Sequence, residues 1–288
     1  MRTFPALDVS WSEPPSEDVL ELLLAVVDDH EPTAAEEHPL GTRVYFTDDV
    51  QRDAALSAVR DQFPAATVEA LLVSDENWAE RSQAALRPVR IDNIIVAPPW
   101  TLEEVRAHAA ARGEAPHVIA IQPSMGFGTG HHASTRLCLK LLQRHLPAAA
   151  TVLDIGTGSG VLAIAATALG ATRAIGIDFD RDALTSAAEN VELNHAGAAV
   201  SLEVVDIARG TDALAGRFTL VFANITGAML QRHAAAVVSP LAPKGVLITS
   251  GFQTHELDEV AAAFTTQGLE RLDDVEEETW VAAAFRRP

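Results

Sequence analysis

The second half of this 288-residue chain alternates short apolar segments with helical ones, and this alternation restricts its fold more than any other feature. The apolar runs of strand length are 152–156, 174–178, 201–206, 220–225 and 245–251. Near-continuous apolar strands joined by helices are typical of a parallel sheet that is covered on both faces. The sequence therefore predicts a doubly wound α/β domain, to which the tail 280–287 would add an antiparallel edge strand.

The first seventy residues follow a different pattern. The segments that resemble strands are 4–11, 30–37 (weakly), 42–47 and 66–73, and those that resemble helices are 16–30 and 48–63. Their order is that of a small α+β ferredoxin-like domain. We therefore expect a ferredoxin-like domain at 1–73, a linker at 74–100 that begins as a short helix and ends at Pro98 and Pro99, and the doubly wound domain at 101–288.

The amino-acid composition limits the classes of protein to which this chain can belong. Hydrophobic residues make up 48% of the chain, which is enough for a sizeable core. The N-terminus has no apolar run of signal-peptide length, and no stretch approaches the ~20 apolar residues of a membrane span. Cys138 is the single cysteine and lies in an apolar helical segment, so a disulfide framework and a cysteine-rich zinc site are excluded. The expected location is the cytoplasm.

The charge is strongly negative and unevenly distributed. A formal net charge of −19 argues against a broad nucleic-acid surface, which needs clustered Lys and Arg, so no direct nucleic-acid binding is expected. Residues 1–70 hold 15 Asp and Glu against 4 Arg. Such an excess can attract a basic protein partner, or it can reflect solubility or a salt-adapted host, and charge alone does not separate these readings.

Three glycines at alternate positions, Gly156, Gly158 and Gly160, come directly after the first apolar run and begin a helical segment. The dinucleotide fingerprint needs its third glycine one place later, where this chain has Val161. A Walker loop needs Gly-Lys-Ser/Thr, and no lysine is near. Neither phosphate-binding motif is met.

A polar residue ends each of the next three apolar runs. Asp178 follows the glycines by about 20 residues, where a carboxylate can accept both ribose hydroxyls of an adenosine. Asp206 can reach the adenine amino group, and Asn224 ends the following run. One such residue after each strand is difficult to attribute to turn chemistry, so the pattern predicts an adenosine-containing ligand. The adjoining residues assigned to the same predicted site are Asp154, Phe179 and Ile207.

The glycine spacing in "LDIGTGSG" resembles that of class I methyltransferases, which use S-adenosylmethionine. With "FGTGHHASTRLCL" and "FANI", it closely resembles the bacterial methyltransferases of the large-subunit stalk-base ribosomal protein, number eleven. "NWAERSQAALRPVRI" is similar to the linker of that family. The resemblance implies methyl transfer from S-adenosylmethionine to amino groups, on a lysine side chain and/or the N-terminus, of a basic ribosomal protein that the N-terminal domain recognises.

The resemblance also implies roles for single residues. A loop of Phe127, Gly128, Thr129 and Gly130 would fold over the cofactor, and Thr135 would touch it. Asn224 would orient the acceptor amine and is the candidate catalytic residue, although it could also cap the next helix. The chain departs from the family pattern at 122–126 and in Asn-Ile-Thr at 224–226, where Asn-Ile-Leu is usual. These departures leave the exact substrate open.

Other functions stay open. One alternative is a class I methyltransferase that acts on another protein or a small molecule, and another is a cofactor-binding module without catalysis. The amino-methylating motif "NPPY" is absent, which disfavours nucleic-acid and glutamine substrates. His131 and His132 are adjacent, lack a carboxylate at ligand spacing, and are expected to serve the loop and not a metal.

Overall fold

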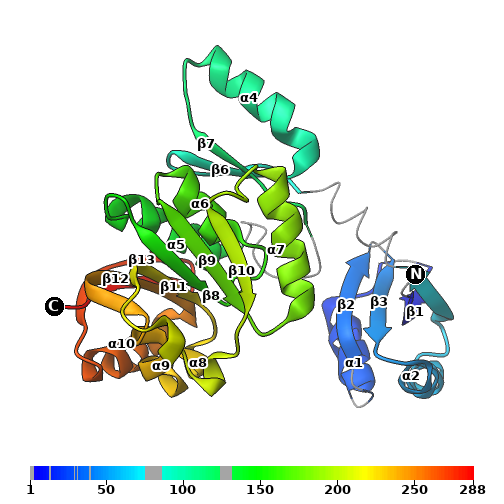
Figure 1. The fold of residues 1–288 in the computed structure, drawn as a ribbon. Coiled ribbons are helices and arrows are strands. Elements are labelled where there is room, and N and C mark those ends of the chain that lie inside the picture. The colour runs from blue at the N-terminus through cyan, green and yellow to red at the C-terminus, as the bar shows by residue number, and fades with distance from the viewer. Residues whose placement is uncertain are drawn as a thin grey trace. The chain divides into compact units, whose positions relative to one another are not determined.

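The chain divides into two compact units, Met1–Ala85 and Leu86–Pro288, in a computed structural model (Figure 1). The structure describes residues 3–12, 14–28, 30, 32–38, 40–74, 86–123 and 132–288. The helix expected early in 74–100 and the loop of residues 127–130 lie outside these ranges. Within them, no helix is both long and apolar enough to cross a membrane.

The first unit has the ferredoxin-like order that the sequence predicts, including the weak strand near residue 32. Its elements are β1 (Thr3–Ser10), α1 (Glu17–Asp28), β2 (Pro32–His38), β3 (Gly41–Phe46), α2 (Asp49–Gln62) and β4 (Thr67–Ser74). The antiparallel sheet has the order β2–β3–β1–β4. Alternate strand residues such as Leu7, Val44 and Phe46 are fully buried in a core that includes Leu23 and Val59 from the helices.

The second unit begins with a small sheet whose first two strands lie within the predicted linker, 74–100. Its elements are β5 (Val89–Ile91), β6 (Ile94–Ala97), the 3-10 turn η1 (Pro99–Thr101), α4 (Leu102–Ala111) and β7 (His117–Ala120). β5 and β6 form a hairpin, and β6 runs parallel to β7. Runs of three and four residues are too short for a pattern of period two, so sequence reasoning missed β5 and β6.

The main sheet has the order β10–β9–β8–β11–β12–β14–β13 (Figure 1). Its strands are β8 (Thr151–Ile155), β9 (Arg173–Asp178), β10 (Val200–Val204), β11 (Phe218–Asn224), β12 (Leu241–Gln253), β13 (Glu270–Glu277) and β14 (Trp280–Arg286). The α-helices of this domain are α5 (Ala133–His145), α6 (Val161–Ala168), α7 (Arg181–Leu193), α8 (Gly227–Arg232), α9 (Ala234–Val238) and α10 (Leu257–Thr266). The short 3-10 turns are η2 (Ile207–Arg209), η3 (Asp212–Leu214) and η4 (Thr254–Glu256).

The doubly wound fold is confirmed, with one correction. β8 to β12 are parallel, and two apolar cores lie on opposite faces of the sheet. β14 is antiparallel as expected, but it is not the edge strand, because β13 pairs along its outer side. The sequence of β13, ERLDDVEE, is largely charged and exposed, which is typical of an edge strand and hides it from an apolar pattern.

Candidate active site

The glycine loop joins β8 to α6 at the carboxyl edge of the sheet. Gly156, Gly158 and Gly160 have φ values of 67°, 53° and 80°, in the left-handed region that glycine adopts without strain. A Cβ atom at Gly156 would lie 2.6 Å from Ile225 Cγ2, so space also requires glycine there. The Gly156 and Thr157 amides donate to the Ile177 carbonyl at 2.9 and 3.0 Å, which fixes the loop against β9.

Asp154 supports this loop from within the core. It is 1% exposed, and its Oδ2 accepts hydrogen bonds from Thr157 Oγ1 at 2.7 Å and from the Ala163 amide at 3.3 Å. Its Oδ1 has no hydrogen-bond partner among the described residues. Burial raises the pKa of Asp154 to about 7, with a further contribution from the charge of Asp178, and the two hydrogen bonds oppose that rise.

Two more carboxylates stand at the ends of the neighbouring strands. Asp178 ends β9 and is 9% exposed; its Oδ2 accepts from the Gly158 amide at 3.1 Å and its Oδ1 from the Asp180 amide at 3.0 Å. Each oxygen keeps a further lone pair for a ligand hydroxyl. Asp206 follows β10 and accepts from the Ala208 amide at 2.9 Å, so it also caps a 3-10 turn. Phe179, 74% exposed, lies between these two carboxylates in the sequence and lines the same cavity.

Asn224 is the last residue of β11, between β8 and β12 in the sheet. The helix that follows starts at Gly227, its N-cap is Thr226, and no side chain caps it. The alternative in which Asn224 merely caps that helix is therefore wrong. The cavity includes Asn224 together with Ile225 and Thr226.

A histidine and a tryptophan form the opposite wall, and sequence reasoning did not assign either to the site. His132 is the N-cap of α5: its Nδ1 accepts from the Ser134 amide at 3.3 Å and lies 2.7 Å from Ser134 Oγ. Its ring packs edge-to-face on Trp280, with centroids 4.4 Å apart. Burial lowers the pKa of His132, and the charge of Arg136 lowers it further. Both effects favour the neutral imidazole.

These residues surround one cavity of about 480 Å³. The predicted site residues that line it are Thr135, Gly156, Gly158, Asp178, Phe179, Asp206, Ile207 and Asn224. Asp154 and Gly160 are not among the lining residues; they hold the loop from behind. The lining residues that sequence reasoning missed include His132, Ser134, Asp180, Met229, Gly251 and Trp280. No cluster of His, Cys, Asp or Glu suited to a metal occurs in the described ranges.

A doubly wound sheet whose glycine loop and strand-end carboxylates line one cavity defines a class I methyltransferase. The family model described as "Ribosomal protein L11 methyltransferase (PrmA)" matches residues 18–288. This chain belongs to that family. Its fold and its membership confirm the resemblance to this family that the sequence motifs predict.

Individual relatives agree with this assignment. A "Ribosomal protein L11 methyltransferase" of Pelotomaculum thermopropionicum is 40% identical over 224 residues, 77% of this chain and 70% of that protein. One from Geobacter metallireducens is 35% identical over 263 residues, 87% of this chain and 83% of that protein. The crystal structure of a ribosomal protein L11 methylase from Lactobacillus delbrueckii is 26% identical with a TM-score of 0.59, covering 70% of this chain and all of that one.

Proposed function

We propose that this protein transfers methyl groups from S-adenosylmethionine to amino groups of ribosomal protein L11, on lysine side chains and/or the N-terminus. The observation that carries the proposal is the match of the family model over residues 18–288, together with a cavity placed where class I methyltransferases bind their cofactor. Ribosomal proteins are made in the cytoplasm, where this enzyme would act.

The residues of the cavity suit the adenosyl part of the cofactor. Asp178 offers two carboxylate oxygens for the ribose hydroxyls, and Phe179, Asp206 and Ile207 would surround the adenine. Gly156 lets the backbone approach the methionine part without a side chain in the way. Asp154 behind the loop has an oxygen without a described partner, and a buried carboxylate oxygen of that kind is expected to gain a donor or an ordered water.

S-adenosylmethionine supplies an electrophilic methyl group on a sulfonium when it is bound. An acceptor lysine, with an ordinary pKa of about 10.4, must lose its proton before its nitrogen can attack that methyl. Asn224, at the carboxyl edge of β11, would accept a hydrogen bond from the amine and align it, which is an orienting role and not a basic one. His132 and Trp280 would close the far side of the cavity and limit the access of water. The roles of Phe127, Gly128, Thr129 and Gly130 stay predictions.

The first unit would recognise the substrate. One row of register partners crosses its sheet and consists of Glu36, Arg43, Asp8 and Glu69. Arg43 bonds to Asp8, with Nε to Oδ1 at 2.8 Å, so its charge is balanced within the row. The row therefore keeps an excess of two negative charges on the face of the sheet opposite the helices. Such a face suits a basic partner, and a ribosomal protein that binds RNA has that character.

Incubation with purified L11 and S-adenosylmethionine, followed by mass spectrometry of the product, tests the proposal. Each transferred methyl group replaces a hydrogen, so we expect the product mass to rise in steps of ~14 Da. We also expect the initial rate of methylation to rise from pH 7 to 9, because more of the acceptor amine becomes neutral. Methylation of a different protein or of a small molecule in a cell extract would support the alternative substrates. If the protein bound the cofactor but transferred no methyl group, the remaining alternative would be a cofactor-binding module without catalysis.

A further inference from the structure

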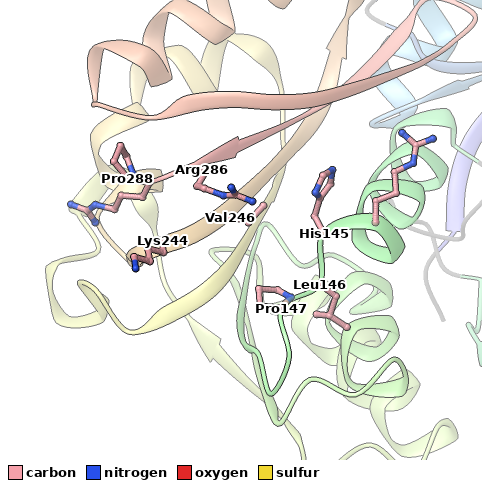
Figure 2. A pocket seen from close by; sticks show the side chains of 9 residues that line it. His145, Leu146, Pro147, Lys244, Val246, Arg286 and Pro288 are labelled. Atoms are coloured by element: carbon pink, nitrogen blue, oxygen red, sulfur yellow. The ribbon is translucent and has the colours of Figure 1, made fainter.

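A second cavity, of about 610 Å³, lies at the opposite edge of the main sheet. It is lined by the start of β12, by the end of β14, and by the last residues of α5 and those that follow it (Figure 2). Val246 lines this cavity and Gly251, on the same strand, lines the methyltransferase cavity. Five residues of extended strand span about 17 Å, so the two cavities are separate.

Basic side chains dominate this second cavity. Five of its nine lining residues are basic: Arg144, His145, Lys244, Arg286 and Arg287. This concentration is unusual in a chain that carries 40 Asp and Glu and 21 Lys and Arg. The acidic side chains near it among the described residues are Asp273, which pairs with Arg144, and Glu270, the register partner of Arg286 on β13. Four permanent cations therefore face two anions, and the cavity keeps a positive charge.

Two of the cations are held in place by partners of their own. Asp273 Oδ2 lies 3.2 Å from Arg144 Nη1 and 2.8 Å from His145 Nε2. Burial raises the pKa of Asp273, but the hydrogen bonds from His145 and Arg144 outweigh it and leave that pKa below its usual value. The Arg287 guanidinium donates to the Leu241 carbonyl at 2.5 Å. Arg144 and Arg287 thus keep their positions at the rim.

Lys244 and Arg286 differ from Arg144 and Arg287 in their contacts. Both are exposed, and neither side chain has an ion pair or hydrogen bond with any residue in the described ranges. Lys244 has a φ of 62°, a left-handed conformation that lysine rarely adopts and that fixes where its side chain leaves the backbone. Figure 2 shows Lys244 and Arg286 on neighbouring strands, with Leu146 and Pro147 across from them.

From this arrangement we infer that the second cavity binds a small phosphorylated ligand with a flat apolar part, such as a nucleoside diphosphate. Guanidinium and ammonium groups are the side chains that bind phosphate oxygens best, and two of them are unpaired here. The lining residues Leu146, Pro147 and Val246 supply apolar surface for a base or sugar. The volume is typical of a site for a small molecule.

The charge of the whole chain favours a small ligand over a nucleic acid. A long polyanion would lie along a surface with a net charge of −19, whereas a nucleotide would experience only the field within about 8 Å of the cluster. The inference does not rest on the proposed methyl transfer. The probe should therefore lack adenine, so that it does not compete for the first cavity.

Calorimetry with the full chain and uridine diphosphate, inorganic pyrophosphate and uridine tests the inference. We expect uridine diphosphate to bind more tightly than pyrophosphate, because of the apolar wall, and uridine not to bind. The variant Lys244→Asn/Arg286→Gln should weaken uridine diphosphate binding by about a hundredfold, about tenfold for each charge-assisted contact. Asparagine adopts the left-handed conformation more readily than lysine, so this variant should fold, which its melting temperature will check.

Two controls make the result specific. Arg106→Gln/Arg173→Gln removes the same charge from exposed positions outside this cavity and should leave affinity unchanged. Asp178→Ala should also leave it unchanged, whether or not the first cavity binds S-adenosylmethionine. Absence of binding, or an equal loss in the Arg106/Arg173 variant, would overturn the inference. Tighter binding of a hexauridylate than of uridine diphosphate would overturn the choice of a small ligand.

Discussion

Asp154 and Asp178 stand on adjacent strands near the same edge of the sheet, yet their surroundings give them different tasks. Asp178 lines the cavity and offers its oxygens to a ligand, while its bonds to the Gly158 and Asp180 amides hold it in place. Asp154 is buried behind the glycines and bonds to Thr157 and Ala163. The two residues are therefore separable by experiment, one through ligand affinity and the other through stability.

Asp178→Ala should weaken binding of S-adenosylhomocysteine by about a hundredfold or more. The two ribose hydroxyls would lose a charged acceptor, and hydrogen bonds to charged groups contribute about 1.5–3 kcal/mol each. Calorimetry on the purified protein measures this directly. Asp212→Ala removes one carboxylate from an exposed position and should leave affinity unchanged. Equal affinity in wild type and Asp178→Ala would remove Asp178 from the site.

Asp154 makes the stability of the ligand-free protein depend on pH. Its pKa is about 7 in the folded state and 3.8 when unperturbed, so the folded state holds the proton more tightly. Its stabilising contribution is complete below pH 4 and is lost as pH rises through 7. Against Asp154→Asn, the free energy of unfolding of the wild type should fall by about 1.4 kcal/mol per pH unit in that window. Urea denaturation at pH 4 to 8 measures it, and a pH-independent difference would refute it.

At the scale of elements, α5 connects the cavity to the edge of the sheet. His132 at its start lines the cavity, and basic residues along it face acidic residues of β13. Arg136 bonds to Glu277 Oε1 through Nε at 2.9 Å and Nη2 at 2.5 Å. β13 and β14 form a hairpin, so these pairs also hold Trp280, the first residue of β14, beside His132.

A double-mutant cycle of Arg136→Gln and Glu277→Gln should give a coupling energy of about 1 kcal/mol at pH 7, since both side chains are mostly buried. The hydrogen bond from Arg136 lowers the pKa of Glu277 more than burial raises it. The coupling is therefore present above the usual glutamate pKa of 4.5 and should shrink as pH falls below it. The more exposed pair Arg271 and Asp274 on β13 serves as the matched control, with coupling near zero. Equal coupling in both cycles would contradict the assigned role.

Some of these elements could be predicted from the sequence and others could not. The parallel strands were predictable because each is an apolar run that ends in a glycine loop or a polar residue, as at Asp178 and Asn224. β13 was not, because only Leu272 and Val275 of its eight residues pack on an apolar core, while its charged residues pair with the basic face of α5. His132 and Trp280 lie about 150 residues apart, and only the β13–β14 hairpin brings them together. No local pattern records such a contact.

At the scale of the whole molecule, each unit has the means to fold by itself. The first has its own core between sheet and helices, and the second has apolar cores on both faces of its main sheet. Every described residue that lines the methyltransferase cavity belongs to the second unit. Cofactor binding and substrate recognition should therefore be separable by truncation, and the cut should come before β5, which pairs with β6.

A chain that starts at Leu86 should bind S-adenosylhomocysteine with the affinity of the full-length protein. Its methylation of L11 should fall by about a hundredfold or more, the gain that a tethered second binding site typically gives. A short peptide with one lysine, too small to engage both units, should be methylated at equal rates by the two chains, which controls for damage to the active site. Calorimetry gives the affinity, and mass spectrometry gives both rates. If the truncated chain methylates L11 at the full rate, the acidic sheet of the first unit does not recognise the substrate; if it loses the peptide reaction as well, the first unit is needed for the chemistry itself.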